Sequence, residues 1–313
     1  MNNMLSRILP ILLFLLISFT VITQVNAEEK MLPFALGSNE AGKLSDKTAA
    51  VKSALEKNGF TIAGDYSPFA GMHIIVVTNE QLKKAGASHK RAGYIAAQRV
   101  SLTERDGKIQ VAYTNPPYMA AAYQVETDLT DVTGKLKSAL GFERFYGPAE
   151  GKTVEQLNKY HYMFGMEYFD DYMTLAEYSS HDEAVKVLEK NLAAGNAGAF
   201  KVYRIDIPGT EQVLIGVGMK SSAKGDAKAN KFMDETFIMS EIDFKEIRSS
   251  AHLPYEVLVR GDEIEALHAR FRIAINFTDL AMMGDNSFMN IMSTPGAIKE
   301  LLTKVAGGEE EEI

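Results

Sequence analysis

Cysteine is absent from all 313 residues of the chain. This absence excludes disulfide bonds, cysteine nucleophiles and thiolate metal ligands. A chain of this length can bury a core without covalent cross-links, so the absence is compatible with an oxidising compartment. A stripe of basic residues is also missing, and 33 lysines and arginines stand against 41 aspartates and glutamates. We therefore expect no binding to nucleic acid.

Signatures of common enzyme classes are also missing. The chain has no G-x-S-x-G elbow for a nucleophilic serine and no glycine-rich nucleotide loop after a strand. The tetrapeptide Asn115-Pro116-Pro117-Tyr118 matches a motif of amino-group methyltransferases. Without a nucleotide loop, we interpret it as a proline turn that ends a strand. A non-enzymatic function is favoured, and catalysis stays an open question.

Long apolar runs are confined to the beginning of the chain. A single positive charge, Arg7, precedes the almost wholly apolar stretch from Ile8 to Ile22, and the small-residue pattern Val25-Asn26-Ala27 follows. This order is typical of a cleavable secretory signal peptide, and the apolar stretch is shorter than the roughly 20 residues that span a bilayer. We predict a signal peptide over 1–27, cleavage after Ala27, and a periplasmic or secreted protein without a membrane span after cleavage.

One series of segments occurs twice in the same order. The helix-like stretch from Ala50 to Asn58 recurs from Ala184 to Asn191, and each copy is followed by two strand-like runs, a hairpin and a closing amphipathic helix. We predict an α+β fold made of two tandem repeats, residues 30–145 and 171–307. Each repeat is expected to be an antiparallel sheet with helices packed on one face, and the two are expected to have a pseudo-two-fold arrangement.

The segments between and after these repeats have predicted roles as well. Residues 146–170 are expected to link the repeats through a helix from Thr153 to Tyr168, 220–252 to be a surface insertion in the second repeat, and 308–313 to be an acidic tail. The hairpin strands of the second repeat are predicted from Tyr255 to Val259 and from Arg270 to Phe277, the latter aligned with the strand that ends the first repeat.

The first repeat carries a recognisable order of short motifs. They are the opening helix followed by Gly59-Phe60, the strand from His73 to Thr78 with Asn79 leading into a helix, and a hairpin ending in Asn115-Pro116. This order resembles the bacterial domain of unknown function 302 family, whose last strand usually ends in Asp-Pro; the second repeat has Asp279-Leu280 there. The resemblance implies a compact α+β sandwich. It also implies that single-copy relatives form dimers, so two fused copies would build a pseudo-symmetric dimer within one chain.

The aligned strand ends carry polar side chains. Thr114-Asn115 and Thr278-Asp279 occupy equivalent positions in the alignment, and Tyr118 follows the first pair. Because ligand sites favour interfaces between such halves, we predict that these five residues bind a small molecule there. The leading hypothesis is a non-enzymatic module that binds a small ligand, a metal or haem.

A second group of residues offers soft metal ligands. The candidates are His161, Met163, Met166, Met282 and Met283. Thioether and imidazole groups suit copper, and the same pair can hold haem iron. Methionine also fills irregular gaps in hydrophobic cores, so the sequence leaves copper, haem and simple packing open.

Two further functions stay open from the sequence. A structural or partner-binding envelope protein would use the insertion 220–252 as its contact surface. A hydrolase would use a pair of carboxylates among Glu167, Asp170 and Asp171.

Overall fold

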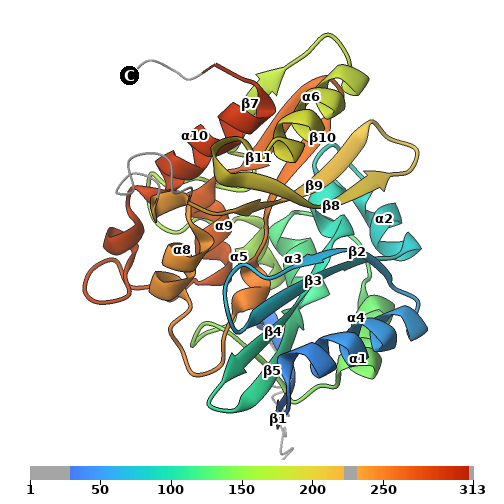
Figure 1. Ribbon diagram of the computed structural model, residues 1–313, viewed down its shortest axis with the longest axis vertical. Coiled ribbons are helices and arrows are strands. Elements are labelled where there is room, and N and C mark those ends of the chain that lie inside the picture. The colour runs from blue at the N-terminus through green and yellow to red at the C-terminus, as the bar shows by residue number, and fades with distance from the viewer. Residues whose placement is uncertain (1–28, 222–230, 310–313) are drawn as a thin grey trace, which may run out of the picture.

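The computed structural model describes residues 29–221 and 231–309, arranged as two antiparallel sheets with helices on either side (Figure 1). Helices α1 (Leu44–Lys57) and α4 (Thr130–Leu140) pack on the first sheet, and α6 (His181–Ala193) and α10 (Thr294–Ala306) pack on the second. The predicted α+β fold is therefore confirmed. The predicted signal peptide 1–27 and most of the acidic tail 308–313 lie outside the described residues.

Six strands form the first sheet and five form the second. The first has the order β2 (Thr61–Tyr66), β3 (Met72–Thr78), β4 (Gln98–Arg105), β5 (Lys108–Thr114), β1 (Phe34–Ala41) and β6 (Arg144–Tyr146). The second has the order β7 (Tyr172–Glu177), β11 (Glu263–Leu267), β10 (Tyr255–Arg260), β9 (Gln212–Met219) and β8 (Ala199–Ile207). We refer to residues 29–146 as the first half, 147–171 as the connecting segment and 172–309 as the second half.

The two halves share one connectivity. Apart from β6, the first sheet has the order β2-β3-β4-β5-β1, and the second has β8-β9-β10-β11-β7. Helices fall at matching places, since α3 (Pro116–Ala122) and α9 (Ala269–Asn276) each follow the last hairpin of their half. The pseudo-two-fold arrangement of the halves stays a prediction.

Local sequence signals explain several of these elements. Helix α6 buries Ala184, Val185, Leu188 and Leu192 on one face, and Ser180 caps it by accepting a hydrogen bond from the backbone of the third helical residue. The hairpin of β4 and β5 turns at Asp106-Gly107, where both residues have positive φ as a tight two-residue turn requires. Strands β3 and β9 are almost wholly buried, because both faces of each central strand are covered.

The segment predicted as the last strand of the second half is a helix. Residues 269–276 form α9, and the hairpin closes instead with β11, which turns from β10 at Gly261-Asp262. Polar and apolar residues nearly alternate along Arg270-Phe271-Arg272-Ile273, as they do in a strand. In the helix, Arg272 and Asn276 are buried with the apolar residues, so the segment has no solvent-facing polar stripe. The predicted alignment of Ile273 to Asp279 with Ile109 to Asn115 is therefore wrong. By connectivity, α9 is instead the counterpart of α3.

The predicted linker helix is much shorter than expected. Helix α5 covers only Val154–Asn158, and it begins with a capping box between Thr153 and Gln156. Beyond it, the hydroxyls of Tyr160 and Tyr162 donate hydrogen bonds to backbone carbonyls of the second half at 3.1 and 2.7 Å. These tertiary contacts hold the chain in an irregular path that helical periodicity does not predict.

The segment predicted as a surface insertion contributes to the core. Helix α8 (Glu235–Ile242) lies between β9 and β10, as α2 (Glu80–Gly86) lies between β3 and β4. Its Ile238 and Ile242 are buried. The short helix η4 (Ser250–His252) is also buried and contacts β4 and β5, while η1 (Ala92–Ala96) contacts β8, β9 and β10. Each half therefore places a short helix on the sheet of the other half.

A buried ion pair joins the two sheets. The Arg99 Nη1 of β4 donates to Glu256 Oε2 of β10 at 2.8 Å, and Tyr203 of β8 donates to the other oxygen of Glu256 at 2.7 Å. Both charged residues are 1% exposed. Burial lowers the pKa of Arg99, but the Glu256 carboxylate together with Tyr123 and Tyr203 outweighs it, so the net pKa is raised and the guanidinium stays charged.

Candidate functional site

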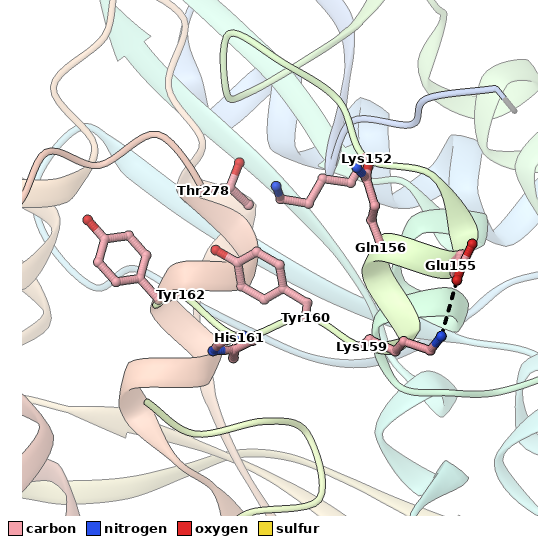
Figure 2. Close-up of a pocket in the computed structure, with 8 residues that line it drawn as sticks. All are labelled: Lys152, Glu155, Gln156, Lys159, Tyr160, His161, Tyr162 and Thr278. Atoms are coloured by element: carbon pink, nitrogen blue, oxygen red, sulfur yellow. Dashed lines mark hydrogen bonds and ion pairs between the residues drawn. The ribbon is translucent and has the colours of Figure 1, made fainter. Parts of the chain in front are cut away.

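A pocket of about 400 Å³ lies where the connecting segment meets the second half (Figure 2). This volume is in the range of small-molecule sites. All lining residues but one come from α5 and the chain on either side of it. They are Lys152, Glu155, Gln156, Lys159, Tyr160, His161, Tyr162 and, from the second half, Thr278.

Two tyrosine rings form rigid walls of this pocket. The Tyr160 hydroxyl donates to the Ala274 carbonyl and the Tyr162 hydroxyl to the Leu280 carbonyl, and the ring of Tyr162 stacks on Phe288 with centroids 5.4 Å apart. Burial raises the pKa of both phenols, so they stay neutral. The aromatic surface is thus held in place before any ligand arrives.

One ammonium group and one hydroxyl group in the pocket are free. Figure 2 shows the Lys152 side chain extending toward Thr278. Within residues 29–221 and 231–309, the Lys152 ammonium makes no ion pair or hydrogen bond; it lies 5.2 Å from the centroid of the Tyr160 ring. The Thr278 hydroxyl likewise has no hydrogen-bond partner in these ranges. Lys159, by contrast, is paired with Glu155 at 3.1 Å.

His161 presents one ring nitrogen for binding. Its Nδ1 lies 2.8 Å from the Met163 carbonyl oxygen, and its ring stacks on Tyr168 with centroids 4.4 Å apart. Because a carbonyl oxygen only accepts, Nδ1 carries the hydrogen and Nε2 is left to accept a hydrogen bond. Together, the free ammonium, the hydroxyl, the imidazole and the two rings fit a small anion with a flat apolar part.

Of the five predicted ligand-binding residues, only Thr278 lines this pocket. Thr114, Asn115 and Tyr118 are buried, and each uses polar atoms on protein partners: Gln98, the Leu32 carbonyl and the Ile275 carbonyl respectively. Asp279 is engaged by the Ala149 amide at 2.9 Å and by the Lys245 ammonium at 2.7 Å. Thr278 and Asp279 follow a helix rather than a strand, so the two predicted pairs are not equivalent in the fold.

The predicted metal ligands are spread over two loops. His161, Met163 and Met166 lie after α5, while Met282 and Met283 lie between α9 and η5 (Phe288–Ile291). Met166 and Met282 pack against the core, whereas Met283 is 76% exposed. In the ranges 29–221 and 231–309, no group of three or more histidine, aspartate or glutamate side chains could hold a metal ion. That search does not include methionine, so the copper and haem hypotheses stay predictions.

Glu167, Asp170 and Asp171, the three acids of the hydrolase hypothesis, contact different groups. Glu167 Oε1 accepts from Arg270 at 2.7 Å and lies 3.3 Å from His268 Nε2. Asp171 accepts from the Tyr168 amide at 2.9 Å, within one turn. Asp170 lines a separate pocket of about 190 Å³ with His89, Lys90, Arg91, Gln124 and Phe169. These contacts do not arrange a carboxylate pair around one pocket.

Sequence reasoning missed most of the pocket. Lys152, Gln156, Tyr160 and Tyr162 were not predicted as site residues. One signal was available in the run Lys159-Tyr160-His161-Tyr162, where aromatic and basic side chains alternate just after a short capped helix. The prediction of a long helix obscured it, because a helix would point neighbouring side chains in different directions.

Within the described part of the chain, no helix is both long and apolar enough to cross a membrane. Comparison of the chain with models of known protein families, with curated proteins and with solved structures finds no match.

Proposed function

We propose that this protein is a non-enzymatic binding protein for a small anionic molecule that carries a flat apolar group. The single observation that carries the proposal is a pocket walled by two fixed tyrosines and lined by the Lys152 ammonium and the Thr278 hydroxyl, neither of which has an ion-pair or hydrogen-bond partner in the described part of the chain. The ammonium and hydroxyl would bind the anionic group, and the rings of Tyr160 and Tyr162 would pack against the apolar part.

Binding of aromatic carboxylates and aryl phosphates, such as benzoate and phenyl phosphate, tests this proposal. We expect Lys152→Met to weaken binding roughly tenfold or more and Thr278→Val to weaken it by a smaller factor, because a hydrogen bond to a charged group is worth more than a neutral one. Titration calorimetry measures both. Lys84→Met, which removes an exposed lysine of α2 away from the pocket, is the matched control.

Two results would count against the proposal. One is equal affinity of the wild type and Lys152→Met for every anion that binds. The other is loss of folding in Lys152→Met, which circular dichroism detects and which would show that the lysine is structural.

A metal ion or haem is the alternative to an aromatic anion as the ligand of this protein. The absorbance spectrum and elemental content of protein purified without added metal test it directly. A Soret band or near-stoichiometric copper would favour His161 and the methionines as ligands. A protein without either, which binds aromatic anions, would favour the anion pocket.

Export and family membership are further parts of the proposal. We infer from the sequence of the first residues that the protein is cleaved after Ala27 and acts in the periplasm or outside the cell. N-terminal sequencing of the mature protein tests this, with Glu28 as the expected first residue. The resemblance to the domain of unknown function 302 family also stays a prediction.

A further inference from the structure

A second pocket, of about 250 Å³, lies at the interface between the two halves. It is separate from the first pocket and shares no lining residue with it. The loop before β3 and the end of β4 supply one side, and α8 with the chain after it supplies the other. The lining residues are Phe69, Ala70, Gly71, Met72, Thr103, Glu104, Arg105, Thr236, Met239, Ser240, Asp243 and Arg248.

Two guanidinium groups line this pocket. Arg105 is held by the Lys245 carbonyl at 3.2 Å and by the exposed Asp106 carboxylate at 3.4 Å. Arg248 is half-buried, and in the described ranges its guanidinium makes no hydrogen bond or ion pair. Burial and the nearby positive charge of Arg105 lower the pKa of Arg248, although Asp243 opposes them. An unpaired cation beside a like charge is stabilised when an anion binds between them.

A buried hydroxyl also lacks a partner at this pocket. The Thr103 side chain lines the pocket, the residue is only 8% exposed, and its hydroxyl has no hydrogen-bond partner in the described ranges. A buried polar group without a partner is costly. Because the hydroxyl oxygen is itself shielded from solvent, a ligand oxygen meets it only when the Thr103 side chain rotates toward the pocket, so the hydroxyl adds to the arginines and does not point to a ligand by itself.

The two carboxylates at the pocket weaken its positive potential only in part. Glu104 is exposed to solvent, which screens its charge. Both oxygens of Asp243 accept hydrogen bonds, from the Ser249 amide at 2.7 Å and the Ser250 hydroxyl at 2.6 Å. Burial raises the pKa of Asp243 to about 6, so its negative charge is reduced at mildly acidic pH.

We propose that this pocket is a second binding site, which takes the carboxylate or phosphate group of a small aliphatic molecule. Arg248 and Arg105 hold the anionic group, and the Thr103 hydroxyl donates to one of its oxygens. The apolar chain packs against Phe69, Met72 and Met239. The ligand bridges both halves. Arg105, at the end of β4, belongs to the first half, and Arg248, in the chain after α8, belongs to the second.

Methionine methyl NMR of the full chain tests this proposal with two probes, hexanoate and hexyl phosphate, and with hexan-1-ol as the neutral analogue. We expect saturable shifts of the Met72 and Met239 methyl signals with at least one anion and much weaker binding of the alcohol. The anion that binds more tightly identifies the head group as carboxylate or phosphate. Arg248→Gln should weaken binding roughly ten- to hundredfold.

Control variants keep the test specific to this pocket. Thr103→Val keeps the side-chain shape, removes the orphan hydroxyl and should weaken binding about tenfold while folding is retained. Arg204→Gln, at a surface ion pair elsewhere, should bind as the wild type does. Unchanged affinity of Arg248→Gln, equal binding of hexan-1-ol, or no saturable shift with either anion would overturn the proposal.

Discussion

Glu235 is an acid buried between the two halves. It begins α8, is 2% exposed, and accepts a hydrogen bond from the Tyr66 hydroxyl of β2 at 3.0 Å. Burial raises its pKa to about 8, against the lowering effects of the Tyr66 hydrogen bond and the positive charge of Arg272. The folded protein therefore holds a proton here that the unfolded chain releases above about pH 4.5, the ordinary value for glutamate.

This proton links stability to pH. Between about pH 4.5 and 8 the native state binds more protons at Glu235 than the unfolded state does, so the free energy of unfolding falls as pH rises. We expect Glu235→Gln to reduce this slope, because the neutral amide has no proton to lose. Urea unfolding at a series of pH values measures the slope.

Glu56→Gln is the matched control, since Glu56 is an exposed glutamate of α1. It should leave the slope as it is in the wild type. If Glu235→Gln keeps the full wild-type slope, Glu235 is not the group that holds the proton.

At the scale of elements, a buried threonine of β5 makes side-chain hydrogen bonds to β4. The Thr114 hydroxyl donates to Gln98 Oε1 at 2.8 Å and accepts from the Arg99 amide at 3.1 Å. Thr278, with which Thr114 was aligned in the sequence, lies in a pocket and makes no such bonds in the described ranges. The two threonines therefore have different physical roles.

Valine substitution separates these roles. Thr114→Val leaves the side chain of Gln98 and the amide of Arg99 unpaired, and we expect it to lower the free energy of unfolding by about 1–3 kcal/mol. Thr278→Val should change stability by less than about 0.5 kcal/mol and act on ligand binding instead. Denaturant unfolding of both variants measures the difference, and equal losses would show that Thr278 is structural as well.

Elements with strong local signals could be predicted from the sequence. The capped helix α6, the Asp106-Gly107 hairpin and the buried strands β3 and β9 follow from capping, turn chemistry and continuous apolar runs. The run from Ala269 to Asn276 could not be assigned in this way, because its polar residues nearly alternate with apolar ones as in a strand, and Arg272 and Asn276 are buried where helical periodicity places polar residues in solvent.

The site could be predicted only in part. The sequence predicts Thr278 as a ligand residue at the end of a strand; the residue lines the pocket, but it follows helix α9. His161 was chosen as a metal ligand and lines the same pocket. Lys152 and the two tyrosine walls could not be found, since their meeting with Thr278 depends on contacts across more than a hundred residues.

At the scale of the whole molecule, the two halves are joined as one unit. Short helices η1 and η4 each pack on the opposite sheet, and the Arg99–Glu256 pair connects the sheets in a buried environment. The edge strands β2 and β8 also lie against each other near the centre of Figure 1. Because so much of the contact between halves is buried, we expect both sheets to unfold in one cooperative step.

Gly64 lies where β2 closely approaches β8. A Cβ added there would lie 2.2 Å from the Val202 carbonyl oxygen and 2.8 Å from the Tyr203 Cβ, so the backbones would have to move apart. We expect Gly64→Ala to lower the free energy of unfolding by about 1–3 kcal/mol. Native-state hydrogen exchange should show equal losses of protection in β3 and β9, because the substitution acts on the joint of both sheets.

Gly134→Ala is the control for this substitution. Gly134 lies in helix α4, and a Cβ added there meets no atom within 4 Å, so alanine should stabilise the protein by about 0.5–1 kcal/mol through helix propensity. If Gly64→Ala lowers protection in β3 and leaves β9 unchanged, the halves open independently. In that case the interface between them is a contact of two separate folding units, and the second pocket could open without loss of either sheet.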